Sequence, residues 1–376
     1  MRRGLVRIGA LAAKEALHIR RDPFTLYLAL ALPLLMIVLF GYGVSLDIDH
    51  IPLAVHDEDR SPESRALVDA FTAAHEFEAV GALEDAGAAG EAFARGRASA
   101  VLTVPAGYAD RLARGEVATV ALLLDASDAQ ATQQALTRAD ALAQVVTAEV
   151  VQARLGGMQV AAPLSARAWT RYNPAGRSAL FLVPGLTAYV LAIVCVLLTS
   201  LAVAREWERG SMEQLFSTPV GRLEIIVGKL LPYLALGGVQ VLLVLTAGAW
   251  IFDVPARGDL VVLAVASLLF LVGMLGQGLL ISVVTRNQLV ATQASTMSAM
   301  LPSMLLSGFM FPIANMPGVL RALSHVVPAR YFITVLRGVL LKGTGWAELW
   351  PDLGMLALFA TLMIAASTAR FQRKLA

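Results

Sequence analysis

The sequence predicts a polytopic α-helical membrane protein with six transmembrane helices and an α/β domain inserted between the first and the second. Two observations on its 376 residues support this fold class. The mean hydropathy of +0.67 and the 57% share of hydrophobic residues are too high for a soluble globular chain. In addition, six long stretches contain no Asp, Glu, Lys or Arg, and an acidic stretch separates the first of them from the others.

The six uncharged stretches are the predicted membrane spans. A helix rises ~1.5 Å per residue, so roughly 20 apolar residues cross the hydrocarbon core. The first stretch is too long to be the apolar region of a signal peptide, and no cleavage site closes it. The last stretch is long enough when Trp350 and Pro351 lie at the interface. The stretches are Pro23–Leu46, Ser178–Ala204, Leu230–Phe252, Leu260–Thr285, Asn287–Leu320 and Leu353–Ala369.

Residues 1–22 are predicted to form an amphipathic helix on the inner leaflet, before a first transmembrane helix at 23–46. Basic residues fill one part of its surface, and apolar residues lie near another. A disordered basic tail is the alternative. The apolar residues are Leu5, Ile8, Leu11, Ala12 and Leu17.

Charge predicts the orientation of the spans. Six basic residues precede the first span, and Arg370, Arg373 and Lys374 follow the last. Six spans place both termini on one side, and the positive-inside rule makes that side cytoplasmic. We therefore expect both termini to be cytoplasmic and residues 47–177 to be periplasmic or extracellular. Four basic residues oppose this assignment because they fall in an outer loop: Arg321, Arg330, Arg337 and Lys342.

The insert at 47–177 is predicted to be an α/β domain with a linker back to the membrane. Residues 47–175 hold 10 Arg, no Lys and 18 acidic residues, a net charge of −8. Two predicted strands end at Asp57 and Asp125, each just before a helix whose turn the Asp can cap. The pattern gives strands at 51–56, 77–80, 98–104 and 117–124, and helices near 62–74, at 83–93, from about 106, and at 128–155.

The sequence contains no complete motif for ATP hydrolysis. A phosphate-binding loop requires G-x-x-x-x-G-K-[ST], because the glycines let backbone N–H groups hold phosphate and the hydroxyl holds magnesium. The nearest match has six residues between Gly221 and Gly228, and Leu230 replaces the hydroxyl. No nucleophile and base occur with meaningful spacing either. We therefore expect a non-catalytic chain that binds no cofactor.

Two other classes of site also lack support. The predicted span interiors contain no Asp, Glu, Lys, Arg or His, which argues against an ion-coupled secondary transporter. An acidic group at the start of the insert has no recognised metal-ligand spacing, so we expect a solvated acidic edge and no metal site. This group is Asp47, Asp49, His50, His56, Asp57, Glu58 and Asp59.

A charged segment at about 205–220 lies between the second and third spans. The capping-box spacing of Ser211 and Gln214 predicts a short helix that begins at residue 212. Thr218 and Pro219 predict that the next helix begins at Pro219. A partner could dock here, although an ordinary solvated loop is the alternative. The side chains that we expect to be exposed as anchors are Met212, Leu215 and Phe216.

Three blocks of residues carry a resemblance to a known family. The first comprises Arg171-Tyr172-Asn173-Pro174, Arg177-Ser178 and Phe181-Leu182-Val183-Pro184-Gly185. The second comprises Arg205, Glu206, Glu208, Gly210, Ser211, Glu213, Leu215, Thr218, Pro219, Glu224, Gly228 and Lys229. The third comprises Ser307-Gly308-Phe309, Phe311-Pro312, Asn315-Met316-Pro317, Pro328, Arg330-Tyr331-Phe332, Arg337-Gly338 and Lys342-Gly343. In order and spacing they resemble type-2 ATP-binding-cassette (ABC-2) exporter permeases, particularly bacterial multidrug members with a large extracytoplasmic insert. Met212 departs from the Thr that is common at its position.

The resemblance implies an exporter permease subunit in a bacterial inner membrane. Spans rich in Leu, Val, Ala and Met suit an amphipathic, lipid-like or drug-like substrate, which would leave the cytoplasm or inner leaflet. Two identical or similar permeases would work with two cytoplasmic ATPases, which use ATP and Mg. The implied residues for coupling to the ATPase are Glu206, Glu208, Gly210, Ser211, Met212, Glu213, Leu215 and Phe216. The five-helix region at 178–376 would include a re-entrant outer segment at about 309–345.

The implied outer mouth contains Phe309, Phe311, Pro312, Arg330 and Arg337. Arg330 and Arg337 are seven residues apart and share a helical face, which we expect to meet anionic lipid headgroups or an anionic substrate. Membrane lipid and a periplasmic membrane-fusion adaptor are further expected partners, and nucleic acid is not. Two alternatives are an ion-coupled secondary transporter and a membrane-anchored sensor whose insert binds a ligand.

Overall fold

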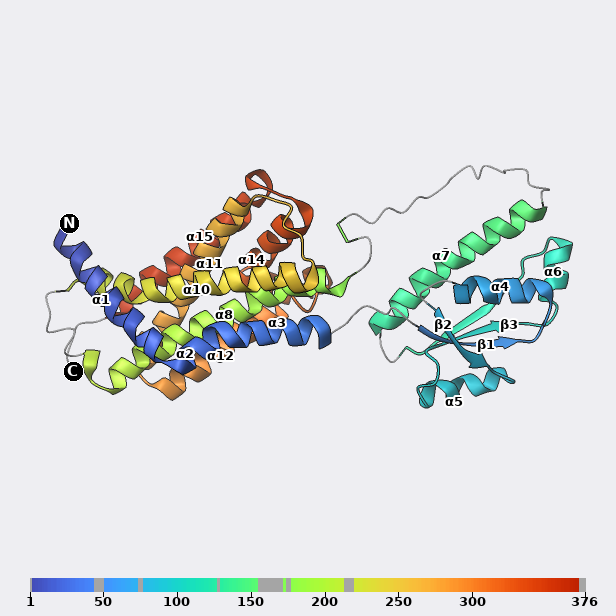
Figure 1. The fold of residues 1–376 in the computed structure, drawn as a ribbon, viewed down its shortest axis with the longest axis horizontal. Coiled ribbons are helices and arrows are strands. Elements are labelled where there is room, and N and C mark those ends of the chain that lie inside the picture. Colours follow the sequence, from blue (N-terminus) through green and yellow to red (C-terminus); the bar gives the residue numbers. More distant parts are fainter. Residues whose placement is uncertain are drawn as a thin grey trace. The chain divides into compact units, whose positions relative to one another are not determined.

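The computed structural model describes residues 2–43, 51–73, 77–126, 129–154, 172–173, 177–212 and 220–371. The chain divides into two compact units. Unit 1 comprises Met1–Ser45 and Thr170–Ala376, and unit 2 comprises Leu46–Trp169. Figure 1 shows unit 1 as a bundle of long helices and unit 2 as a sheet covered by helices.

Unit 1 consists of helices that are long and apolar enough to span a membrane, together with shorter ones. Among the described residues five segments pass as spans: Pro23–Tyr42, Ser178–Glu208, Arg222–Phe252, Leu260–Thr285 and Trp346–Arg370. A sixth is obtained if Gly318–Ser324 and Pro328–Lys342, bent by 80° at their junction, count as one span. Unit 1 is therefore polytopic. Its helices are α1 (Arg2–Arg21), α2 (Pro23–Leu26), a π-helical turn (Tyr27–Ala31), α3 (Leu32–Gly43), α8 (Ser178–Glu208), α10 (Arg222–Phe252), α11 (Leu260–Thr285), α12 (Gln288–Leu305), α13 (Gly318–Ser324), α14 (Pro328–Arg337), a second π-helical turn (Gly338–Lys342) and α15 (Trp346–Arg370).

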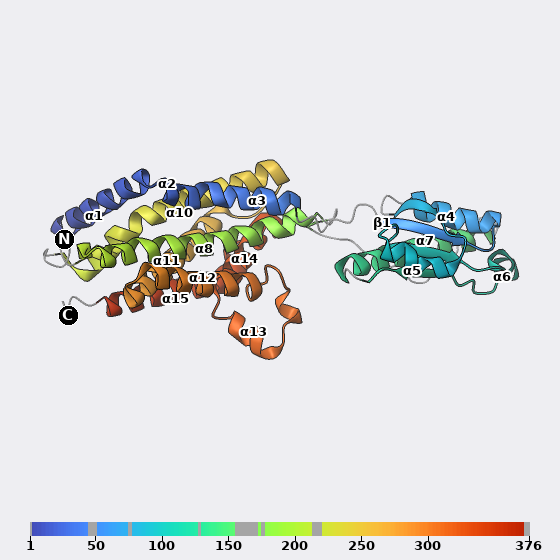
Figure 2. The same cartoon turned by 90° about the horizontal axis from the view of Figure 1, so that it is seen from below.

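Helix α8 is the centre of the bundle. Its most apolar window is 78% buried, whereas that of α10 is 28% buried. It packs against α3, α10, α11, α12 and α14, and Figure 2 shows it between α3 and α10 on one side and α11 and α12 on the other. Small residues let these helices approach closely. A Cβ at Gly278 of α11 would lie 2.1 Å from Oγ1 of Thr199, and this hydroxyl donates to the Leu275 carbonyl at 3.1 Å.

The predicted fifth span, at 287–320, is not confirmed as one span. Of the uncharged stretch from residue 287 to 320, only α12 forms a long helix, and α12 is not among the five apolar segments. The chain then leaves the helix because Gly308 takes a left-handed conformation (φ +82°) and Pro312 follows. The buried residues of α12 are four apart and small: Ala291, Ser295, Ala299 and Ser303.

The two ends of unit 1 differ. The first, here called the α1 end, contains α1, the last turn of α8, the first turn of α10 and the last turn of α15 (Figures 1 and 2). The second, the α14 end, contains α14, the start of α8 and the last turns of α3 and α10. There the rings of Tyr42 and Phe252 contact each other at an angle of 49°, with their centroids 5.0 Å apart. The chain leaves unit 1 for unit 2 after α3 and returns before α8, so both connections start at the α14 end.

Unit 2 has a four-stranded sheet in the order β2-β1-β3-β4. Strand β1 (Ile51–Asp57) is parallel to β2 (Phe77–Ala82) and β3 (Ala100–Val104), and β4 (Ala121–Leu124) is antiparallel to β3. On one face, the core includes Leu53, Leu102 and residues of α4 (Pro62–Ala73), α6 (Tyr108–Arg114) and α7 (Ala129–Arg154). On the other, Ala54 and Val101 pack against α5 (Ala89–Ala94). This alternation follows from the two-residue period of a strand.

Most predicted elements of unit 2 are confirmed, and two are wrong in their bounds. The predicted helix at 83–93 begins only with a 3₁₀ turn at Ala86–Ala88, because Leu83 still donates to the Val55 carbonyl at 2.8 Å. Strand β4 begins at Ala121 and not at residue 117. The cap at Asp57 is confirmed, since its carboxylate accepts from the backbone of Asp59 and Arg60 at 3.0 and 2.9 Å.

Candidate functional site

Helix α8 extends beyond its apolar stretch and carries the first residues of the predicted coupling segment. It continues to Glu208, and Arg209 and Gly210 form the turn that ends it. Gly210 has a left-handed backbone (φ +69°), which glycine adopts without steric cost. Its N–H donates to the Trp207 carbonyl at 3.1 Å. The residues from 205 to 208 therefore belong to a long, rigid helix and not to a separate docking loop.

Four consecutive residues at this helix end, Arg205–Glu208, contact residues of five other helices or their caps; we call them the α8 hub. Successive helical residues are rotated by ~100°, so four of them point around the whole circumference. Arg205 Nη1 lies 3.4 Å from Oδ2 of Asp22, which caps α2. The guanidinium of Arg286, where α11 ends, lies over the Trp207 ring at 4.5 Å.

The two carboxylates of the α8 hub complete its contacts. Glu208 accepts from the backbone N–H of Gln288 at 2.7 Å and also from its side-chain amide, so it caps the first turn of α12. Glu206 pairs with Lys14 of α1 at 3.3 Å and with Lys229 of α10. The α8 hub thus joins α1, α2, α10, α11 and α12 at one level of the bundle.

Lys229 is the most buried charge of this end, with a side chain that is 4% exposed. Its ammonium lies 2.8 Å from Oε1 of Glu15, which is 6% exposed, and also contacts Glu206. Lys14 and Lys229 balance the charges of Glu15 and Glu206. A buried charge requires such partners because removal from water costs several kcal/mol per ion. The network therefore fixes the position of α1 against α8 and α10.

Helix α1 contacts α10 at two further points. A Cβ at Gly228 would lie 2.8 Å from Cβ of Leu11, so only glycine permits this distance between the two helices. Glu224 accepts from the N–H of Gly221 at 2.8 Å and lies 3.6 Å from the guanidinium of Arg7. Glu224, Gly228 and Lys229 thus lie on the surface of α10 that packs against α1. Since residues 222–229 are helical, they form no phosphate-binding loop.

Several expectations for the coupling segment need correction. Met212 is fully buried (0% exposed), in a cluster with Leu11 and Ile225, because the turn at Gly210 directs it back into the bundle. Ser211 is already helical, and its hydroxyl donates back to the Glu206 carbonyl at 3.2 Å. The next helix begins at Arg222 and not at Pro219, since the residues at 220 and 221 are not helical. Glu213, Gln214, Leu215, Phe216 and Thr218 lie outside the described residues.

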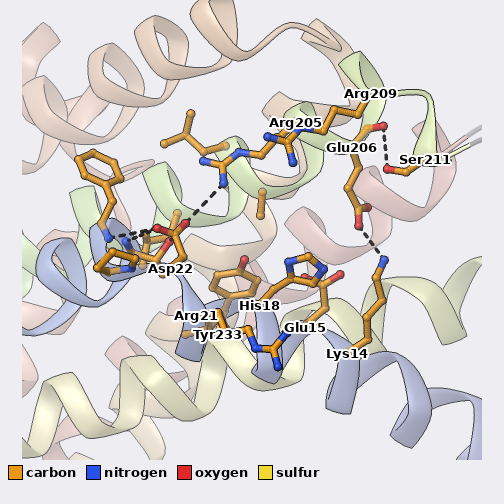
Figure 3. A pocket seen from close by; sticks show the side chains of 17 residues that line it. Lys14, Glu15, His18, Arg21, Asp22, Arg205, Glu206, Arg209, Ser211 and Tyr233 are labelled. Carbon is orange, nitrogen blue, oxygen red and sulfur yellow. Dashed lines mark hydrogen bonds and ion pairs between the residues drawn. The ribbon is translucent and has the colours of Figure 1, made fainter.

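A pocket of about 760 Å³ opens beside the α8 hub, between α1, α2 and α8 (Figure 3). Apolar side chains and charged groups both line it. The labelled residues in Figure 3 are Lys14, Glu15, His18, Arg21, Asp22, Arg205, Glu206, Arg209, Ser211 and Tyr233.

The predicted outer-mouth residues lie at the α14 end, but they do not form one surface. Phe309 is buried, with its ring stacked on Tyr189 at 5.8 Å, whereas Phe311 and Pro312 are exposed. Arg337 donates to the Gly308 carbonyl at 3.1 Å, and its guanidinium lies 4.1 Å from the centre of the Phe181 ring.

The basic residues of this outer segment bond to it locally. Arg330 donates to the Ser324 hydroxyl, and Arg321 donates to the Ala314 and Met316 carbonyls at 2.7 and 3.2 Å. The expectation that Arg330 and Arg337 present one free cationic face is therefore wrong for Arg337, which turns inward. These hydrogen bonds give Arg321, Arg330 and Arg337 a structural role in an outer loop, where the positive-inside rule disfavours basic residues.

Asp57 and Asp59, at the start of unit 2, accept hydrogen bonds from backbone N–H groups of the same unit. Asp59 accepts from the N–H groups of Gly107, Tyr108 and Ala109 at 2.8–3.0 Å, at the start of α6. A hydrogen bond from the Ser61 side chain, together with these backbone bonds, lowers the pKa of Asp59. Asp47, Asp49 and His50 lie outside the described residues, and within those that are described no cluster of three His, Cys, Asp or Glu is placed to hold a metal.

The sequence reasoning missed Lys14, Glu15 and Lys229 as functional candidates. Glu15 is the only acidic residue among the first 21, and it lies four residues from each of Leu11 and Ile19. An acid in an otherwise apolar helical row needs a buried cation. That spacing indicates a buried cationic partner for Glu15, but it does not identify the partner as Lys229.

Comparison with known proteins agrees with the residue blocks. A family model described as ABC-2 family transporter protein matches residues 23–369. The chain is 33% identical over 373 residues to the probable multidrug ABC transporter permease YbhS of Escherichia coli (strain K12), covering 98% of this chain and 97% of that protein. It is 29% identical over 372 residues to the probable multidrug ABC transporter permease YbhR of the same strain (98% and 99%), and 23% identical over 359 residues to its inner membrane transport permease YhhJ (90% and 92%). With its membrane-spanning helices, the chain is a multi-pass membrane protein that belongs to the ABC-2 family of transporter permeases.

Proposed function

We propose that this protein is the non-catalytic permease subunit of an ATP-driven exporter, and that a separate pair of ATPases moves it through the segment after α8. The α8 hub is the observation that supports this proposal best. A force applied just beyond Gly210 reaches the last turn of the most buried helix, and that turn contacts five other helices. ATP and Mg would bind to the ATPases and not to this chain.

Rigid-body motion of packed helices is the mode of movement that such a hub suits. Met212 is buried among residues of α1, α8, α10 and α11, so the turn after α8 cannot move independently of the bundle. Glu208 links the same turn to α12. ATP binding that pulls two ATPases together would therefore shift α8 and α12 as one body.

The exposed face of α12 is our candidate for the substrate path and for contact with a second permease copy. Gln293 and Ser298 are exposed there, and the Ser298 hydroxyl accepts from the amide of Gln277 at 3.2 Å. Side-chain amides are costly against lipid, so polar groups in a span commonly face protein or a water-filled cavity. Met297 and Leu301 lie exposed among them. A path with both kinds of side chain suits an amphipathic, lipid-like or drug-like substrate.

We further propose that the α1 end is cytoplasmic in a bacterial inner membrane. The basic residues of α1 and Arg370 of α15 lie at this end, as the positive-inside rule requires. Unit 2 then lies outside the cytoplasm, because both of its connections start at the α14 end. There it could contact a periplasmic adaptor.

Co-purification with the cognate ATPase tests the central proposal. We expect the ATPase to remain bound to the wild-type chain and to be lost from Glu213→Arg, which reverses a charge in the coupling segment. Glu116→Arg makes the same charge change at an exposed position of unit 2 and should retain the ATPase. The proposal is wrong if the ATPase never associates, or if both variants bind it equally.

A further inference from the structure

The pocket beside the α8 hub has an excess of positive charge. Its walls carry Lys14, Arg21, Arg205 and Arg209 against Glu15, Asp22 and Glu206, and Lys229 adds a fifth basic group to the network. Every acid of the pocket has a cationic partner: Glu15 pairs with Lys229, Asp22 with Arg205, and Glu206 with Lys14 and Lys229. Five bases and three acids leave a net charge of +2.

Two arginines carry this excess. Among the residues that the structure describes, neither Arg21 nor Arg209 has an ion-pair partner. They come from opposite walls, since Arg21 ends α1 and Arg209 follows the last residue of α8 (Figure 3). His18, one turn before Arg21, lines the pocket from the same wall as Arg21. A planar guanidinium binds a phosphate through two parallel hydrogen bonds.

The remaining wall of the pocket is apolar. Leu198, Leu201 and Ala202 of α8 face Ile19 and Phe24 of the α1–α2 segment. The first membrane span begins at Pro23, directly at the pocket, and α1 exposes apolar side chains that suit a helix lying at a membrane surface. The pocket therefore lies where headgroups meet acyl chains, and its lining offers both cationic and apolar side chains.

We propose that this pocket binds one anionic phospholipid. Its phosphate lies between Arg21 and Arg209, and the upper part of an acyl chain lies along Leu198 and Leu201. The pocket volume of about 760 Å³ accommodates a headgroup and the start of a chain. The lipid supplies the negative charge that the two arginines lack, and it joins α1 to the end of α8. The site does not depend on the ATPase or on the exported substrate.

Native mass spectrometry of the purified full-length chain tests this site with phosphatidylglycerol and phosphatidylcholine of equal chain length. We expect one phosphatidylglycerol to be retained in preference to phosphatidylcholine. Arg21→Gln/Arg209→Gln should weaken its binding roughly 30-fold, because each surface cation contributes to the affinity for anionic lipid. The matched control is Arg20→Gln/Arg222→Gln, which removes the same charge at exposed positions that do not line the pocket. This control should retain the lipid.

Three outcomes would overturn the proposal. The first is equal retention of phosphatidylglycerol by the two double variants, and the second is no preference over phosphatidylcholine in the wild type. The third is displacement by glycerol phosphate at the concentration of the lipid, which would mean that the pocket takes a free phosphate ester. A photoactivatable phosphatidylglycerol should also label residues 198–202 of the wild-type chain, so the test does not depend on the folding of a variant.

Discussion

Lys229 of α10 and Glu15 of α1 form a buried ion pair, with 2.8 Å between Nζ and Oε1. The pair attaches the amphipathic N-terminal helix to the membrane bundle, and Glu206 extends the attachment to α8. These ion pairs fix the position of α1 against α8 and α10. Motion of the α8 hub must therefore displace α1 as well.

Removal of the buried cation should destabilise the bundle strongly. Lys229→Met leaves Glu15 buried without a partner, and breaking a buried pair from one side costs about 3–5 kcal/mol. Lys342→Met removes an exposed lysine and should change little. Thermal unfolding in detergent gives the comparison. Glu15→Gln/Lys229→Met, which removes the orphaned charge too, should recover part of the loss. A double variant that is no more stable than Lys229→Met would show that the pair itself matters little.

Two glycines of α10 should respond oppositely to alanine. At Gly228 a Cβ would overlap Leu11, so Gly228→Ala should cost about 1–3 kcal/mol as α1 is pushed away. At Gly238 nothing lies within 4 Å of the added atom, and Gly238→Ala should be neutral or stabilising by up to about 1 kcal/mol. Unfolding temperatures measured side by side decide this. Equal effects at both sites would mean that α1 does not pack against Gly228.

Arg337 should be needed as an arginine. Arg337→Lys keeps the charge but loses the planar contact with Phe181 and the geometry of the bond to the Gly308 carbonyl. We expect a loss of about 1–2 kcal/mol in stability. The exposed Arg222 is the control, because Arg222→Lys should be silent. If Arg337→Lys unfolds at the wild-type temperature, the inward contacts are unimportant. Export by the double variant Arg330→Gln/Arg337→Gln then tests whether these arginines bind anionic lipid headgroups or an anionic substrate. Unchanged export would exclude that role.

The insert should lose stability as pH rises past neutrality. The Leu83 carbonyl, at 2.9 Å from Nδ1, and Glu58, at 3.0 Å from Nε2, together raise the pKa of His56 above 6.5. A raised pKa means that this stabilisation is complete below about pH 6.5, where the unfolded residue is also protonated, and is lost as pH rises through the folded-state pKa. Deuterium exchange at the imidazole carbon gives the pKa directly, and Glu58→Gln should lower it. A His56 pKa below 6.5 would refute the assignment.

The sequence predicted what depends on local pattern. Uncharged length gives α8 and α11, and period-two and helical patterns give β1, α4 and α7, because each signal lies within one segment. The lone acid in α1 and the lysine at the edge of α10 are 214 positions apart, so no local pattern connects them. For Met212 the local pattern is misleading. Its neighbours in the sequence are charged, which suggests exposure, but the turn at Gly210 directs it into the core. Tertiary contacts decide both.

The separation of Glu15 from Lys229 also constrains how the protein is assembled. Synthesis proceeds from the N-terminus, so α1 emerges while the lysine that neutralises its buried acid does not yet exist. Unit 2 and α8 precede α10 in the chain, so both are synthesised before Lys229. Until then, the Glu15 carboxylate needs water, and α1 cannot settle into its final place. Closure of the N-terminal helix onto the bundle therefore cannot accompany insertion of the first span, because it requires the start of α10 to have been made.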